Sequence, residues 1–431
     1  MRASSKNVLS ILEDVIIIFL LVFSLRLPII KTSSYFLFMI LLCRFFCISK
    51  YREIVINLIN TKYVVNILFV YLLIIVSILL STCLHFQFDL TLIPTIINIT
   101  IHLFIAILIV ALFLEKQKDL PYLLNILVAV FLIQSVIEIL AYSFKPILEF
   151  VQLFQSKGSI EKAAAFHGRR GLALAGTLFY GLSCIFGFIF ILIVKKWEYT
   201  PKLSIKDLIV YLLIFIGGFF TGRTFFIGFS LSWLYFFCAN IKFRDKISII
   251  TKFGIMLIFI FLLILSIIPL LPNDLYQQLY NLIWYVFEAA FNYVEYGEVS
   301  TTSSDHLMSK MYFKIPLSTF IFGDGLYTGR DGAYYMHTDA GYMRNVLLFG
   351  VGGLFMLILS DIILLWGARR LRSKKMKMFN IVVFIYISII HIKGEAFGYF
   401  ISLHSILFLI YLLSVFSNYT KSSIKIKAYD Y

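Results

Sequence analysis

The strongest constraint on this chain is a succession of apolar segments too long for the core of a water-soluble domain. A helix needs about 20 apolar residues to cross the hydrocarbon of a membrane. Segments of this kind follow one another along most of the 431 residues, and 61% of the chain is hydrophobic whereas only 14% is charged. The sequence therefore predicts an all-α, polytopic integral membrane protein.

The apolar segments predict about twelve transmembrane helices, which together form a single transmembrane domain over residues 1–431. The first one follows MRASSKN, and we expect it to stay uncleaved because no small-residue cleavage site comes after it. The predicted spans are 15–25, 35–48, 63–84, 96–114, 122–142, 172–194, 208–220, 225–239, 253–271, 341–366, 379–392 and 397–415.

The positions of Lys and Arg predict how these spans are oriented. Every second loop is rich in basic residues, as in GARRLRSKKMK, and this pattern places both termini in the cytoplasm. The formal charge of +15 is therefore mainly topological, and it argues against a nucleic-acid partner. Two long outer loops are predicted at about 143–171 and 272–340. The five cysteines lie in or beside apolar segments without metal-ligand partners, so no disulfide framework and no metal site are indicated.

Arginines at the predicted outer face are the first candidate binding residues. Arg169 and Arg170 precede a span, where they either anchor the helix end by snorkelling or bind a ligand. Arg223 lies in IGGFFTGRTFFIG between two short spans, so the tip of this hairpin is expected below the outer surface. An arginine at that depth needs a buried carboxylate or an anionic ligand. We favour the ligand, because no acidic residue is close in sequence.

The stretch 329–353, GRDGAYYMHTDAGYMRNVLLFGVGG, brings ionisable residues against the start of a span. Its candidate site residues are Arg330, His337, Asp339, Tyr342 and Arg344. Arg344 is expected about one turn inside the helix, facing the same cavity as Arg223. The planar guanidinium suits bidentate binding of phosphate. Beyond this stretch, His391, Lys393 and Glu395 are interpreted as an internal ion pair that closes the cavity.

The layout resembles the O-antigen and capsular polysaccharide polymerases of the Wzy type. The resemblance rests on the number of predicted helices, the two long outer loops, the GRT hairpin and HTDAGYMRNVLLFGVGG. In that family both outer loops can contain Arg, ten further residues and then Gly. Arg170 with Gly181 fits this spacing, and so does Arg330 with Gly341.

The resemblance implies a metal-independent glycosyltransferase without a cofactor. It would join polyprenyl-diphosphate-linked oligosaccharide repeat units at the outer face of the bacterial cytoplasmic membrane, with a flippase and a chain-length regulator as partners. His337 is the expected general base, with Asp339 as the alternative base or the group that orients His337. Arg169, Arg170, Arg223, Arg330, Arg344 and Tyr342 are the expected diphosphate or sugar ligands.

Three alternatives remain open from the sequence, of which the third, a non-catalytic membrane scaffold, gives no reason for Arg223 at depth. The O-antigen ligases resemble these polymerases but pass the glycan to a different acceptor, and the sequence does not separate the two. A polysaccharide flippase or other transporter is a different class, which more often shows internal repeats and charges near the middle of the bilayer. The charges here gather at the predicted outer face instead.

Overall fold

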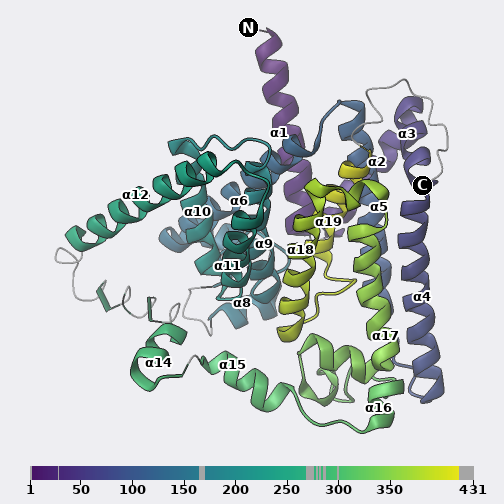
Figure 1. Cartoon of the computed structure of the whole chain (residues 1–431). Helices are drawn as coiled ribbons and strands as arrows, with labels where there is room; N and C mark the ends of the chain where they lie inside the picture. The colour runs from purple at the N-terminus through teal and green to yellow at the C-terminus, as the bar shows by residue number, and fades with distance from the viewer. Residues whose placement is uncertain are drawn as a thin grey trace.

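The fold is helical throughout the part of the chain that the structure describes. This computed structural model describes residues 2–27, 29–164, 170–267, 276–277, 280, 283–284, 288–298 and 300–416. In these ranges the only strands are β1 (Arg26–Leu27) and β2 (Lys31–Thr32), which pair antiparallel. The predicted all-α class is confirmed (Figure 1).

Six helices among the described residues are long and apolar enough to cross a membrane. They are α4 (Lys62–Leu84), α5 (Ile93–Glu115), α6 (Leu120–Ser143), α9 (Tyr180–Trp197), α17 (Gly341–Trp366) and α18 (Lys374–Lys393). A seventh span results if α2 (Ser33–Cys47) and α3 (Ser49–Ile59), which meet at 112°, are counted together. A multi-pass membrane protein is thus indicated, while the predicted number of about twelve spans is not confirmed.

The other predicted spans coincide with helices that are shorter or carry more charge. These are α1 (Arg2–Phe23), α10 (Ile205–Thr221), α11 (Phe225–Cys238), α12 (Phe243–Ile267) and α19 (Ile401–Phe416). Glu13 and Asp14 lie in the middle of α1, and α12 begins with Arg244 and Asp245. Ser204 and Asp207 form a capping box at the start of α10, which satisfies backbone N–H groups that a helix leaves unpaired.

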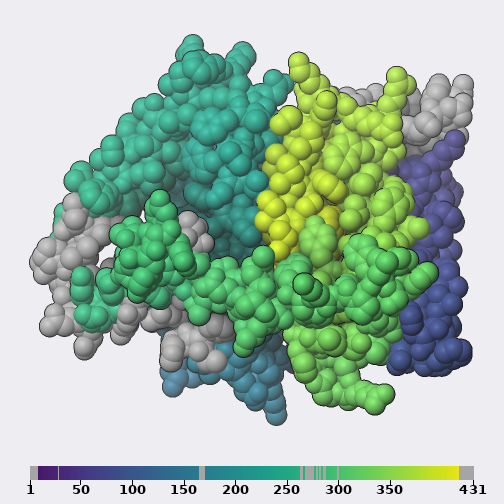
Figure 2. Space-filling view, turned by 60° about the horizontal axis from the view of Figure 1, so that its bottom comes forward, coloured from purple at the N-terminus to yellow at the C-terminus, as the bar shows by residue number. Residues whose placement is uncertain are grey.

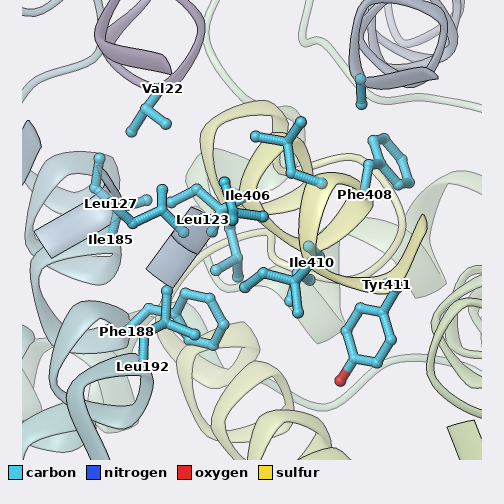
Figure 3. Close-up of a cluster of buried hydrophobic side chains, with 14 of the residues drawn as sticks. Val22, Leu123, Leu127, Ile185, Phe188, Leu192, Ile406, Phe408, Ile410 and Tyr411 are labelled. Carbon is cyan, nitrogen blue, oxygen red and sulfur yellow. The ribbon is translucent and has the colours of Figure 1, made fainter. Parts of the chain in front are cut away.

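The centre of the protein is an apolar contact region between α1, α6, α9 and α19. Figure 3 shows Val22, Leu127, Ile185, Phe188 and Ile406 within this region. These side chains have no more than 1% exposure, and α19 is buried along almost its whole length. The close packing of four helices here provides the rigid frame on which the ends of α9, α10 and α18 are held.

The predicted span 172–194 begins eight residues later than expected, since α9 starts at Tyr180. The preceding residues are buried but not helical, and Leu172 and Ala175 have 2% and 1% exposure. Gly176 donates its N–H to the carbonyl of Phe23 at 2.8 Å, and a Cβ on Gly176 would lie 2.1 Å from the carbonyl oxygen of Ser24. Non-helical backbone is tolerated here because it packs against the end of α1.

Helix α17 is interrupted at Phe349 and Gly350, whose φ values are −138° and 67°. The interruption frees two carbonyls. The N–H of Asp324 donates to Leu347 at 2.6 Å, and the N–H of Gly325 and the hydroxyl of Ser81 donate to Leu348 at 3.1 Å and 2.6 Å. These donors supply the hydrogen bonds that the helix lacks.

Short helices cover one end of the molecule, which we call the loop end. Its elements are α7 (Lys145–Gln152), α8 (Lys157–Ala164), α14 (Glu288–Tyr296), α15 (Thr302–His306), the π-helix η2 (Leu307–Met311), α16 (Leu317–Phe322) and the 3-10 helix η3 (Tyr335–His337). Figure 1 places the N-terminus at the opposite end, where the 3-10 helix η4 (Arg369–Arg372) follows α17. The segment with α14 to α16 crosses the loop end as a green band in Figure 2.

We predict that Gly350 is essential for the interruption of α17, whereas Gly352 is not. A Cβ at position 350 would lie 2.1 Å from the carbonyl oxygen of Ile321, but a Cβ at position 352 would meet nothing within 4 Å. Gly350→Ala should therefore destabilise the protein by about 1–3 kcal/mol. Gly352→Ala should be neutral or stabilising, because alanine favours helix. Thermal unfolding of the purified variants in detergent measures both, and an equal effect of the two would mean that the interruption does not require Gly350.

Candidate functional site

The tip of the hairpin between α10 and α11 is fixed against α9. Ser183 donates its hydroxyl to the carbonyl of Gly222 at 2.6 Å and accepts the N–H of Phe225 at 2.9 Å. Gly222 has a φ of 139°, a conformation that favours glycine. A Cβ on Gly222 would lie 3.3 Å from Nη2 of Arg170, so the guanidinium of Arg170 lies against the turn that presents Arg223.

A cavity of about 540 Å³ opens at this turn. Four cationic side chains line it, from four separate segments: Lys162, Arg170, Arg223 and Lys393. The remaining lining is mainly hydroxyl-bearing or aromatic, and consists of Phe179, Tyr180, Ser183, Thr221, Gly222, Thr224, Thr302, Ser303 and His306. Such a concentration of positive charge beside hydroxyl donors suits an anion with several oxygens. We call this site the arginine cavity.

The positive charges in the arginine cavity perturb one another. Burial and the neighbouring charge of Arg223 lower the pKa of Arg170 to about 10. Arg170 therefore remains charged at neutral pH, and the two guanidinium groups repel each other. Lys393 contributes from the end of α18 and donates to the hydroxyl of Ser303 at 3.0 Å.

Glu288 supplies negative charge to Arg223 from the start of α14. The two side chains form an ion pair, and Glu288 also accepts hydrogen bonds from the N–H of Thr302, at 2.9 Å, and from its hydroxyl. Burial alone would raise the pKa of Glu288, but the bonds from Thr302 and Arg223 lower it below its usual value. The sequence favoured a ligand over a carboxylate as the partner of Arg223. The structure shows a carboxylate, 65 residues away in the chain.

Arg344 does not line the arginine cavity, contrary to the expectation that it faces the same cavity as Arg223. Its Nη1 donates to Glu395 at 2.7 Å, and its guanidinium lies 3.9 Å and 3.7 Å from the ring centroids of Tyr327 and Tyr334. Stacking on two rings suits the planar cation. Arg344 is buried, with 5% exposure. Because it contacts Tyr327 and Tyr334 before α17 and Glu395 after α18, it joins these two segments.

Glu395 accepts hydrogen bonds at the centre of a second group of charged and aromatic side chains, formed by Arg344, Glu395, Tyr327, Tyr334 and Tyr399. Tyr327 and Tyr399 donate their hydroxyls to it at 2.6 Å and 2.5 Å. Burial raises the pKa of Glu395, although Arg344 and the two tyrosines oppose the rise. The sequence placed Glu395 in an internal ion pair with Lys393. In the structure Glu395 pairs with Arg344, and Lys393 turns to the arginine cavity instead.

His391 is held by protein groups on both sides of its ring. Its Nδ1 accepts the N–H of Ala396 at 2.8 Å and the N–H of Phe397 at 3.1 Å. Its Nε2 lies 3.1 Å from the amide of Asn345, which also contacts the hydroxyl of Tyr399 at 2.8 Å. By accepting these two backbone N–H groups, His391 holds the irregular segment 394–400 in place.

The two predicted bases occupy different positions. The side chain of His337 is 77% exposed and its Nε2 lies 3.7 Å from Asp331, so Asp331 is its acidic neighbour. Asp339 is also exposed, but it interacts electrostatically with Tyr180 and Lys393, both of which line the arginine cavity. Of the two candidates, Asp339 is therefore the one whose charge acts on residues of this cavity, although it does not line the cavity itself.

The remaining candidate residues lie elsewhere or outside the described ranges. Arg330 is exposed at a turn closed by the hydrogen bond from Gly329 to Ala333, at 2.8 Å. Tyr342 donates to the carbonyl of Ser388 at 3.2 Å and packs edge-on against His391. Arg169 lies outside the residues that the structure describes.

The glycines of the two Arg and Gly pairs have a packing role. A Cβ on Gly181 would lie 2.4 Å from Cγ2 of Thr177, and one on Gly341 would lie 2.6 Å from the carbonyl oxygen of His391. Both glycines are at the starts of helices, α9 and α17. Of the two arginines in these pairs, Arg170 lines the arginine cavity and Arg330 does not.

Several residues that line the arginine cavity or pair with its arginines were not identified from the sequence as ligand-binding residues. Glu288 lies in an aromatic amphipathic stretch, and Thr302 and Ser303 lie in a polar stretch that gives no sign of a site. Lys393 had a recognisable signal, since it ends an apolar helix.

Comparison of the chain with protein-family models, curated proteins and solved structures finds no match.

We predict that Arg344 stabilises the loop end, and that Arg330 does not. Arg344→Lys keeps the charge but removes the planar group between Tyr327 and Tyr334, so thermal stability should fall by about 1–3 kcal/mol. Arg330→Lys changes an exposed turn residue and should leave the unfolding temperature unchanged. Thermal unfolding of both variants in detergent measures the two changes in stability. Equal stability of Arg344→Lys and wild type would show that the stacking is unimportant.

The contact between α14 and Arg223 should weaken in acid. The folded-state pKa of Glu288 is lowered, so its stabilising contribution is complete above the unfolded-state pKa of about 4.3 and is lost as the pH falls through the lower folded value. Hydrogen exchange of residues 300–306, corrected for intrinsic rates, should therefore accelerate in that acidic range. Glu288→Gln should exchange rapidly at all pH values, whereas Glu295→Gln, an exposed change in the same helix, should behave as wild type.

Proposed function

We propose that this protein is a membrane glycosyltransferase that joins polyprenyl-diphosphate-linked oligosaccharide repeat units at the outer face of the bacterial cytoplasmic membrane. The observation that carries the proposal is the convergence of Arg170, Arg223 and Lys393 on one cavity of about 540 Å³. Its size and charge fit a diphosphate with part of an attached sugar. The resemblance to Wzy-type polymerases in the sequence supports the same substrate class.

The chemistry needs a group that stabilises the departing diphosphate. A hydroxyl oxygen of the acceptor sugar attacks the anomeric carbon of the donor, and the bond from that carbon to the diphosphate oxygen breaks. The electron pair of this bond leaves with polyprenyl diphosphate. Arg170, Arg223 and Lys393 would stabilise the developing negative charge, so the proposed step requires no metal ion. A single displacement of this kind inverts the anomeric configuration.

The acceptor hydroxyl must also lose its proton. Asp339 is the better placed of the two candidate bases, because it interacts with Lys393 and Tyr180 at the edge of the arginine cavity. The carboxylate would take the proton as the new glycosidic bond forms. His337, paired with Asp331 on the exposed surface, would act only after a rearrangement of η3.

Glu288 gives the site a second state. Without substrate, this carboxylate neutralises Arg223. An incoming diphosphate carries more negative charge and would compete for the same guanidinium. Since Glu288 also holds Thr302, and Thr302 and Ser303 line the cavity, its displacement would loosen the segment that covers the site. Substrate entry and release would then follow the opening of residues 288–298 and 300–306.

The membrane placement and the partners belong to the same proposal. The loop end would face outward, with the termini in the cytoplasm, as the basic loops predict. A flippase would deliver the lipid-linked units, and a chain-length regulator would act on the product. Arg344, which the sequence indicated as a substrate ligand, would instead hold the loop that carries Tyr327 and Tyr334.

The test is reconstitution of the purified protein in liposomes with the lipid-diphosphate-linked repeat unit of the producing cell. Wild type should make a ladder of lengthening glycans without any other acceptor. Asp339→Asn should abolish the ladder, and Arg223→Lys should reduce it by about tenfold or more, because the planar fork is lost. Arg244→Lys is the matched control at an exposed position away from the cavity.

Three results would contradict the proposal. Full activity of both Asp339→Asn and Arg223→Lys would mean that the site is wrongly assigned. Transfer to an added second acceptor lipid, without a ladder, would identify a ligase. Movement of the lipid-linked unit between leaflets, without any new glycosidic bond, would identify a transporter. Size-exclusion profiles of each variant show whether it is folded.

A further inference from the structure

A second charged cavity, of about 400 Å³, lies at the end of the molecule opposite to the arginine cavity. It forms where the start of α4 meets the end of α17, and the hydroxyl of Tyr63 joins these helices by donating to the carbonyl of Leu364 at 2.5 Å. Its charged and hydrogen-bonding side chains are Thr61, Lys62, Asn66, Arg369 and Arg372, beside the ring of Tyr63.

The three cations of this cavity are not neutralised by the part of the protein that the structure describes. Within those ranges none of Lys62, Arg369 and Arg372 forms an ion pair with a carboxylate, and all three side chains are exposed. Arg372 donates Nε to the carbonyl of Trp366 at 2.9 Å, which leaves its terminal nitrogens for another acceptor. Three positive groups around a hollow attract a phosphate.

An apolar face continues directly from this cavity along α4. Val65, Phe69 and Leu72 are 49%, 55% and 56% exposed, and the helical period places them on the same side as Lys62 and Asn66. A molecule with a phosphate in the cavity would thus have hydrocarbon contacts immediately beyond it. The residues after Phe416 are a poor alternative occupant, because the sequence 417–431 has three lysines against one aspartate.

We propose that this cavity binds the phosphate headgroup of an anionic phospholipid, with the acyl chains along the exposed face of α4. The charge of the cavity selects an anion, and the apolar face selects a lipid over a soluble phosphate. Basic pockets between membrane helices at the cytoplasmic side suit such headgroups. The site is independent of the proposed glycosyltransferase reaction, since it lies at the other end of α4 and α17.

Native mass spectrometry of the detergent-purified full chain tests the site with three probes. These are phosphatidylglycerol, phosphatidylcholine with the same acyl chains, and glycerol 3-phosphate. Wild type should retain phosphatidylglycerol in preference to the other two. The combined variant Lys62→Gln, Arg369→Gln and Arg372→Gln should bind it about tenfold or more weakly. The combined control Lys50→Gln, Arg52→Gln and Arg244→Gln, which removes the same charge from exposed positions outside the cavity, should bind as wild type.

A second variant keeps the test valid if the triple variant does not fold. Asn66→Trp fills part of the cavity without a change of charge, so it should also lose the preference for phosphatidylglycerol. Undiminished binding to Asn66→Trp, or to a folded triple variant, would overturn the proposal. Equal affinity for glycerol 3-phosphate and phosphatidylglycerol would overturn it too, because the site would then recognise a soluble phosphate. An equal loss of phosphatidylglycerol binding in the combined control variant would also overturn the proposal, because the loss would then depend on net charge alone.

Discussion

The arrangement of this protein depends on the requirement that every backbone polar group within a membrane finds a partner inside the protein. Regular helices meet the requirement by themselves. Where the helices stop, the structure supplies other donors and acceptors, as at the interruption of α17, where Ser81 and the loop after α16 bind the freed carbonyls. The irregular segments 172–179 and 394–400 are likewise packed against neighbouring elements. Irregular backbone near the loop end therefore coincides with close packing.

Charged side chains near the loop end also need partners, and two groups of residues meet this need in different ways. Arg344 is enclosed by two tyrosine rings and paired with Glu395, and both partners are largely buried. In the arginine cavity, four cations come from α8, the segment before α9, the GRT hairpin and the end of α18, and the carboxylate that faces Arg223 comes from α14. The charge of the first cluster is balanced within the protein, although Nε and Nη2 of Arg344 have no hydrogen-bond partner among the described residues. The second cluster places four cationic side chains around an open volume, an arrangement that suits an anion with several oxygens.

The sequence predicted the helical class and the need of Arg223 for an anionic partner, because both follow from local patterns. Apolar length gives helices, and an arginine between two short spans must be buried near an anion. It did not predict the partners of the arginines. Glu288 and Glu395 lie 65 and 51 residues from Arg223 and Arg344, so the pairs form only through the arrangement of helices. The start of α9 was misplaced because buried non-helical residues are as apolar as a helix. The sequence ranked His337 above Asp339 as the base, because histidine titrates near neutral pH, but their different surroundings depend on tertiary structure.

The segment after α18 has a geometric consequence of its own. Lys393 and Glu395 are two residues apart, yet they serve different clusters: Lys393 lines the arginine cavity, and Glu395 binds Arg344, Tyr327 and Tyr399. His391 anchors the backbone between them through Ala396 and Phe397. This short stretch therefore connects the two clusters through its backbone. Any effect of an anion bound beside Lys393 on the free energy of the cluster around Glu395 equals the effect of that cluster on anion affinity, because thermodynamic coupling between two sites is reciprocal.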